Sequence, residues 1–273
     1  MALRFGVVLL LALALVNSAA AQVVRFETTV GDFDLVLNPT NNPLLEGHTD
    51  NLLQYVEDER YKGAWINRAS TGFVLQMGGF YSHSVRPPLT VASTRSVVTF
   101  DPVEGEPGIP GLSNTVGTVS LALPGSNVNG GTSSFFVNVG NNMGLDSQFT
   151  VFAAIPNMSV VNEIMSLAQV DRTTDPIFGA GPSNVTFTDI PITDAGRVVF
   201  IERAFVLEDS MSIAAAMSAV APVMAVSGGT SGEAGGSALA STIVVPEPAG
   251  GVLACFGLLV AVSLRRRMRR VTH

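Results

Sequence analysis

The chain has 273 residues, of which 22 are acidic and 15 basic, so its formal net charge at pH 7 is −7. This length allows one or two domains, and the excess of acidic side chains argues against nucleic-acid binding, which needs Lys and Arg to neutralise phosphates. Cys255 is the only cysteine, which excludes an intramolecular disulfide. The histidines, His48, His83 and His273, do not cluster with acidic residues, so we expect them on the solvated surface and expect no metal site.

The first 21 residues have the features of a secretory signal peptide. Arg4 precedes an apolar run at residues 5–16, and small residues at positions 19 and 21 precede Gln22. The apolar run is shorter than the roughly 20 residues that a membrane-spanning helix needs. We therefore expect cleavage after Ala21 and an exported protein.

The first folded elements that the sequence predicts are a β-hairpin and a helix. Residues 23–28 and 33–37 alternate apolar and polar side chains on either side of a turn at Gly31. Residues 42–61 begin with Asn-Pro and carry apolar side chains at helical spacing, with a charged run at the exposed end. This segment is therefore predicted to form a helix with one solvated face.

Two more strands are predicted at residues 65–70 and 73–76, separated by a Thr-Gly turn. Residues 79–115 contain five prolines and four glycines, so we predict mostly loop there, with one short strand near residues 97–100. A loop of this length inside a compact domain is usually functional.

The region around which the chain is organised covers residues 117–152. It contains two apolar runs with strand character, residues 119–123 and 135–139, joined by a loop rich in Gly, Asn and Ser. A third run follows at residues 149–154. Small polar residues in such a loop allow a ligand to approach the backbone closely, so we expect a binding site here.

The C-terminal part of the folded region is predicted to contain one helix and one strand. Residues 157–168 carry apolar side chains at helical spacing, and residues 197–207 form an apolar run that would complete a barrel. Residues 210–244 are rich in Ala, Ser and Gly, so we interpret them as a linker in which residues 211–226 could form a weak helix.

The last segment, residues 245–273, combines Val-Pro-Glu-Pro, an apolar run at 249–264 and a block of five arginines. A short apolar helix followed by cations is held with its arginines on the cytoplasmic side of a membrane. The segment resembles the bacterial PEP-CTERM sorting signal, which implies export machinery, membrane anchoring through the C-terminal helix and removal of the tail by an exosortase-type peptidase. An ordinary tail anchor is the alternative. Residues 22–245 alone carry nine basic and 21 acidic side chains, a net charge of −12.

Four short segments occur in the order in which a known family has them. They are Asn-Thr-Val-Gly-Thr at residues 114–118, Ser-Ser-Phe-Phe-Val-Asn-Val at 133–139, Asn-Asn at 141–142 and Leu-Asp at 145–146. In these segments the chain resembles the cyclophilin peptidyl-prolyl isomerases, particularly their exported bacterial branch. The resemblance implies a mainly β domain at residues 22–209, a closed antiparallel eight-stranded barrel capped by two α-helices, which we expect to be a monomer in the cell envelope or outside the cell.

The resemblance also implies which residues act on a proline-containing polypeptide. Trp-Ile-Asn-Arg at residues 65–68 stands where the family has Phe-His-Arg, which makes Arg68 the catalytic cation. The residues implied for the proline pocket are Phe73, Val74, Phe136, Leu145 and Phe149, and those implied for bonds to the substrate main chain are Gln76 and the backbone around Ala122. Rotation about the bond before proline needs an apolar pocket and a donor to the amide nitrogen, with no nucleophile or cofactor. Taken alone, an arginine is more often a surface cation, and aromatic residues are more often core residues.

The sequence departs from the family at several positions of this site. Asn67 replaces a His, Met77 a Gly and Ser134 a substrate-binding Gln, and Gly144 stands where a bulky residue is common. Loss of the Gln removes a hydrogen bond worth roughly 0.5–1.5 kcal/mol. We therefore expect an isomerase of X-Pro bonds in exported proteins with reduced activity. The alternatives are a cyclophilin-like module that binds proline-containing segments without turnover, and a surface structural protein.

Overall fold

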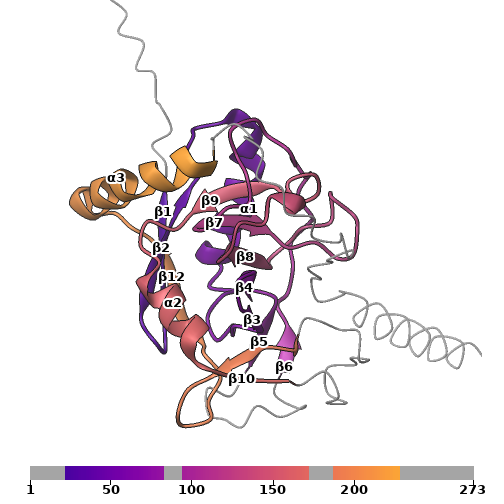
Figure 1. Cartoon of the computed structure of the whole chain (residues 1–273), viewed down its shortest axis with the longest axis vertical. Helices are drawn as coiled ribbons and strands as arrows, with labels where there is room; N and C mark the ends of the chain where they lie inside the picture. The colour runs from indigo at the N-terminus through magenta and orange to yellow at the C-terminus, as the bar shows by residue number, and fades with distance from the viewer. Residues whose placement is uncertain (1–21, 83–93, 172–186, 228–273) are drawn as a thin grey trace, which may run out of the picture.

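The fold was analysed in a computed structural model, which describes residues 22–82, 94–171 and 187–227. Its main element is one curled antiparallel sheet of eight strands (Figure 1). In spatial order the strands are β12 (Ile201–Val206), β1 (Val23–Thr28), β2 (Asp32–Leu37), β9 (Val151–Ala154), β7 (Thr118–Leu121), β8 (Phe135–Asn138), β4 (Val74–Met77) and β3 (Arg68–Ser70). The predicted β fold and the predicted opening hairpin are both confirmed.

The hairpin between β1 and β2 is closed by a side chain as well as by backbone bonds. Thr28 Oγ1 donates to the carbonyl of Gly31 at 2.6 Å and accepts from the backbone N–H groups of Val30 and Gly31. Threonine favours such turns because its hydroxyl can satisfy nearby backbone groups.

The prediction of a closed barrel is wrong, because β12 and β3 are the two ends of the strand order and do not form a ladder with each other. The chain before β3 does bond to the start of β12: around an isolated bridge between Trp65 and Phe200, the N–H of Ile66 donates to the carbonyl of Val199 at 3.0 Å and the N–H of Ile201 to the carbonyl of Ala64 at 2.7 Å. The free edge of β3 bonds elsewhere: the backbone N–H of Ala69 donates to the carbonyl of Asp189 at 2.7 Å. The segment before β11 (Ile190–Ile192) thus occupies the edge that would otherwise complete the barrel.

Two small sheets accompany the main one. β5 (Phe80–Ser82) pairs with β6 (Thr94–Ser96), and β10 (Ala168–Val170) pairs with β11. The strand predicted near residues 97–100 is found slightly earlier, as β6. Strands of three residues, such as β10 and β11, carry too little alternation to be recognised from sequence.

Both predicted helices form, as α1 (Glu46–Glu57) and α2 (Ser159–Ser166). A 3₁₀ turn, η1 (Pro43–Leu45), leads into α1, and the side chain of Asn42 caps it by accepting from the N–H of Leu44. Proline suits the first position of a helix because its missing N–H has no partner there.

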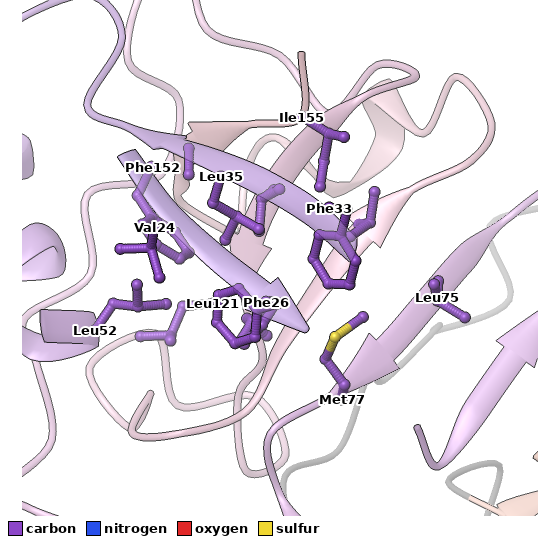
Figure 2. Close-up of a cluster of buried hydrophobic side chains, with 14 of the residues drawn as sticks. Val24, Phe26, Phe33, Leu35, Leu52, Leu75, Met77, Leu121, Phe152 and Ile155 are labelled. Atoms are coloured by element: carbon purple, nitrogen blue, oxygen red, sulfur yellow. The ribbon is translucent and has the colours of Figure 1, made fainter. Parts of the chain in front are cut away.

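The main core lies between the sheet and α1. Figure 2 shows Val24, Phe26, Phe33 and Leu35 of the first hairpin together with Leu52 of α1, and all five are at most 3% exposed. Their positions alternate along β1 and β2, because successive side chains of a strand point to opposite faces.

His48 is buried in α1, only 2% exposed, so the expectation of a solvated histidine is wrong at this position. Its ring stacks on Phe152 with 6.0 Å between the ring centroids. Burial lowers the pKa of His48 from 6.5 to about 4. The neutral imidazole therefore behaves as a core aromatic ring.

A third helix, α3 (Ser210–Ser227), occupies the first half of the stretch interpreted as a linker. Figure 1 shows it along one side of the sheet, and it contacts β2, β7 and β9. Its Ala216 and Val220 are buried in a cluster with Val23, Val36 and Ala154. The Ala- and Met-rich composition favours a helix, but its apolar residues surround the axis, so no amphipathic pattern revealed the packing.

Among the residues that the structure describes, no helix is both long and apolar enough to cross a membrane. The signal peptide predicted at residues 1–21 and the sorting tail predicted at residues 245–273 lie outside the described residues.

Candidate active site

A second apolar cluster lies apart from the main core. It consists of Val74, Ala122, Leu123, Phe136, Leu145 and Phe149, with Phe73 packed against it. All five side chains predicted for the proline pocket belong to it, and so does Ala122. Leu123 is the member that sequence reasoning missed, although its neighbour Ala122 was assigned to the site.

The alternation of β4 and β8 explains why this cluster is separate. In β4, Leu75 and Met77 join the main core, whereas Val74 belongs to the second cluster. In β8, Phe135 joins the main core and Phe136 the second cluster. The candidate site is therefore the opposite face of the sheet that forms the core.

The same face carries the predicted polar residues, in one row across the sheet. In the strand registers, Arg68 of β3 is opposite Gln76 of β4, which is opposite Phe136 of β8. Ser120 of β7 is opposite Phe136 on its other side. Directly opposite residues have neighbouring side chains, so the register brings the predicted cation, amide and aromatic ring together.

Arg68 is buried beside this cluster, with 6% of its surface exposed. Its guanidinium carbon is 5.4 Å from the centroid of the Phe73 ring. Burial lowers the pKa of Arg68, and the negative charge of Asp189 acts in the opposite direction. An arginine keeps its proton at neutral pH despite such a change. Its Nε and Nη1 atoms are buried without a hydrogen-bond acceptor among the described residues, so both donors can serve a ligand.

Gln76 and Ser134 bond to each other on this face. Gln76 Nε2 donates to Ser134 Oγ at 3.3 Å, and Ser134 Oγ donates to the carbonyl of Met77 at 3.2 Å. Ser134, which stands where the family has a long amide, therefore helps to orient Gln76. The backbone N–H of Ala122 donates to the carbonyl of Ser134 at 2.9 Å, which holds Ala122 beside Ser134.

The apolar walls are tightly packed. Val74, Ala122 and Phe136 have no exposed surface, Phe149 is 1% exposed, and the Phe136 and Phe149 rings meet edge to face at 5.4 Å. Phe73 is partly exposed. In this structure the cluster therefore exposes little apolar surface.

A hollow of about 60 Å³ lies elsewhere in the described part of the chain, between the end of α1 and β12. It is lined by residues that include Tyr55, Tyr61, Lys62 and Arg203. None of the predicted site residues borders it.

Two departures from the family have a clear structural position. Met77 belongs to the main core, so its side chain lies on the face of β4 opposite the candidate site. A Cβ atom added at Gly144 would meet no atom within 4 Å, so this position leaves open space beside Leu145.

Polar residues that sequence reasoning did not assign to the site lie beneath it. Asn114, Ser120 and Asn138 are completely buried and bonded to one another, and Asn142 and Asp146 extend the set. Except for Ser120, they lie inside the aligned segments, which was their signal in the sequence. Within the described ranges, no group of three or more His, Cys, Asp or Glu residues is arranged to hold a metal ion.

Comparisons with known proteins identify the family to which the chain belongs. The family model described as cyclophilin type peptidyl-prolyl cis-trans isomerase/CLD matches residues 23–196. A peptidyl-prolyl cis-trans isomerase of Acinetobacter baylyi is 30% identical over 172 residues, which are 61% of this chain and 81% of that protein. Peptidyl-prolyl cis-trans isomerase A of Dickeya dadantii is 32% identical over 123 residues, which are 45% of this chain and 57% of that protein.

Among solved structures, a cyclophilin type peptidyl-prolyl cis-trans isomerase of Cryptosporidium parvum, crystallised in the presence of the dipeptide Ala-Pro, has a TM-score of 0.48 at 18% identity. It covers 69% of this chain and is itself covered completely. The family model alone spans more than half of the sequence. The chain therefore belongs to the family of cyclophilin-type peptidyl-prolyl cis-trans isomerases.

Proposed function

We propose that this cyclophilin isomerises X-Pro bonds of exported proteins and thereby assists their folding, with Arg68 as the catalytic residue. The observation that carries the proposal is the position of Arg68. Its guanidinium is buried, two of its donors have no acceptor among the described residues, and it lies in register with Gln76 and beside the apolar cluster.

The reaction explains why such a group is useful. Rotation about the peptide bond has a barrier of about 18–20 kcal/mol, because resonance is lost as the bond twists. The nitrogen lone pair then becomes localised and can accept a hydrogen bond. A donor aimed at that nitrogen stabilises the twisted state more than the planar one, and exclusion of water strengthens its effect.

The other site residues would hold the substrate. Phe73, Val74, Phe136, Leu145 and Phe149 provide apolar contact for the pyrrolidine ring. Gln76 and the carbonyl of Ala122 would bond to the substrate main chain. Binding of the ring and main chain on both sides of the bond leaves rotation of the amide as the remaining freedom.

An isomerisation assay with the full chain tests this proposal. We expect the protein to accelerate cis-to-trans relaxation of an Ala-Pro test peptide, and Arg68→Ala to remove most of the acceleration. Arg197, an exposed arginine in the turn before β12, provides the control, and Arg197→Ala should retain the wild-type rate. A wild-type rate equal to that in buffer, or equal losses in both variants, would contradict the proposal.

The burial of the apolar walls favours a second candidate function. With Val74 and Phe136 fully buried and Ser134 in place of a substrate-binding Gln, the chain could bind proline-containing segments without turnover, or serve as a surface structural protein. Changes in the NMR spectrum on addition of a proline peptide, without faster exchange between its isomers, would favour the binding module. Absence of both effects would favour the structural role.

The proposed location rests on the two ends of the sequence. Residues 1–21 would direct export as a cleaved signal peptide, and residues 245–273 would hold the protein at the inner membrane until an exosortase-type peptidase removes the tail. The mature protein would act as a monomer in the envelope or outside the cell. Mass spectrometry of protein recovered from a bacterium that has such a peptidase would give both termini. An intact C-terminus would leave the ordinary tail anchor as the explanation.

A further inference from the structure

A network of buried and partly buried polar groups joins the loop that carries Leu145 to the loop that carries Phe73. Its members come from the loop before β7, from β7 and β8, and from the loop around η2 (Met143–Leu145). They are Ser113, Asn114, Thr118, Ser120, Asn138, Asn142 and Asp146.

One half of the network fixes the loop that carries Leu145. Asp146 accepts from the backbone N–H of Asn114 at 2.7 Å, from its side-chain Nδ2 at 2.8 Å and from Ser113 Oγ at 2.5 Å. The backbone N–H of Asn142 donates to the carbonyl of Asn114 at 2.6 Å. Leu145 therefore lies in a short segment that is held at both of its ends.

The other half of the network bonds to the backbone of Phe73. Asn142 Nδ2 donates to the backbone carbonyl of Phe73 and to Asn138 Oδ1, both at 2.8 Å. Asn138 Nδ2 in turn donates to Asn114 Oδ1 at 3.1 Å and to Thr118 Oγ1 at 3.0 Å. The carbonyl of Phe73, which also accepts from the backbone N–H of Val139 at 3.0 Å, thus bonds to a side chain that is three residues from Leu145.

These hydrogen bonds fix distances between backbone segments that the apolar contacts of the cluster do not fix by themselves. Apolar contacts are not directional, so they hold Phe73 and Leu145 together without fixing their exact separation. Hydrogen bonds have narrow ranges of distance and angle, and buried networks in which every group is bonded are rigid. Asn142 is the member that contacts both loops directly.

We propose that Asn142 is a positioning residue for substrate binding: through the Phe73 carbonyl and Asn138, it sets the distance between the Phe73 and Leu145 walls of the proline pocket. This inference rests on the proposed function, because it assumes that the apolar cluster receives the proline ring. Asn142 does not contact the substrate and takes no part in bond rotation.

The neighbouring asparagine provides a matched control. Asn141 is exposed, and its side chain accepts one weak bond, from the backbone N–H of Val116 at 3.4 Å. We expect Asn142→Ala in the full chain to raise KM about tenfold with kcat within about twofold, because misplaced walls weaken binding of substrate and transition state alike. Asn141→Ala should leave both constants unchanged. A merely structural defect would lower the active fraction, and hence kcat, without raising KM.

A second variant and a second measurement keep the inference testable. Asn142→Asp keeps the size of the side chain but places an acceptor against the carbonyl of Phe73, and it should raise KM in the same way. The NMR resonances of the Phe73 ring should shift in both Asn142 variants and not in Asn141→Ala. An unchanged KM, equal effects at the two positions, or unshifted Phe73 resonances would overturn the inference.

The two proposals fail in different ways. If Arg68→Ala loses activity and Asn142→Ala keeps the wild-type KM, the isomerase function stands and the positioning role of Asn142 is wrong. If the wild-type protein is inactive, the proposed function is wrong, and the Phe73 resonances alone decide whether Asn142 places that wall.

Discussion

Lowering the pH from 7 to 5 should destabilise the protein through His48. The ring is 2% exposed and stacked on Phe152, and its buried Nδ1 has no hydrogen-bond partner in the described structure. Burial lowers the pKa of His48 from 6.5 to about 4. Between these values the unfolded chain binds a proton that the folded chain does not bind. The free energy of unfolding therefore falls as the pH falls through this window.

The size of the effect follows from the two pKa values. The difference between 6.5 and about 4 corresponds to a loss of about 3 kcal/mol, which is complete only below both pKa values. About 2 kcal/mol of this loss should already be present at pH 5. Most carboxylates are still ionised at that pH, so this window separates His48 from ordinary acid denaturation.

Urea denaturation of the wild type and of His48→Gln at pH 7 and pH 5 measures the effect. The loss of stability between the two pH values should be about 2 kcal/mol smaller in the variant. His83 and His273 are present in both proteins, so their contributions cancel in this difference. Equal losses in the two proteins would refute the reasoning, and would mean that His48 can be protonated in the folded chain at little cost.

Three further substitutions or truncations test the packing. Ending the chain after residue 209 instead of after Ser227 removes α3 and uncovers Val23 and Val36. This truncation should lower the free energy of unfolding, measured with urea, by about 3 kcal/mol or more. Equal stability would mean that α3 is not part of the folded domain. Gly78 has a φ of +84°, and a Cβ atom added there would lie 2.7 Å from the carbonyl oxygen of Ser133. Gly78→Ala should therefore lower the free energy of unfolding by about 3 kcal/mol. Gly72 has a similar φ of +68° but open space around it, so Gly72→Ala should cost only about 1 kcal/mol. Gly144→Phe should change the free energy of unfolding by no more than about 0.5 kcal/mol, because the added side chain meets open space. The variant should lower KM for a proline peptide if the new ring completes the pocket. A large loss of stability would show that the position is not open.

The regular part of the sheet could be predicted from the sequence. β1, β2, β7, β8 and β9 arise from apolar runs whose alternation or β-branched content is strong enough to outweigh other conformations. The site residues could be assigned only through the aligned segments. An isolated Arg68 or Phe136 has no feature that separates a site residue from a surface or core residue.

The features that were missed depend on long-range contacts. The burial of His48 depends on the position of Phe152, more than 100 residues away. The separation of β3 from β12 in the sheet depends on Asp189, whose carbonyl bonds to Ala69 at the edge of β3. The packing of α3 depends on an apolar surface that exists only after β2 and β9 have paired. Local periodicity contains no information about such partners.

The division of β4 between two faces makes this region sensitive to a change in length. Loss or gain of one residue before Val74 would exchange the two sets of positions, turning Leu75 toward the face of the candidate site and Gln76 toward the main core. Point substitutions at Val74 or Gln76 change the face of the candidate site and leave Leu75 and Met77 in the main core. Variation among related enzymes should therefore accumulate as replacements in this strand, and a single-residue deletion should abolish folding and activity in one step.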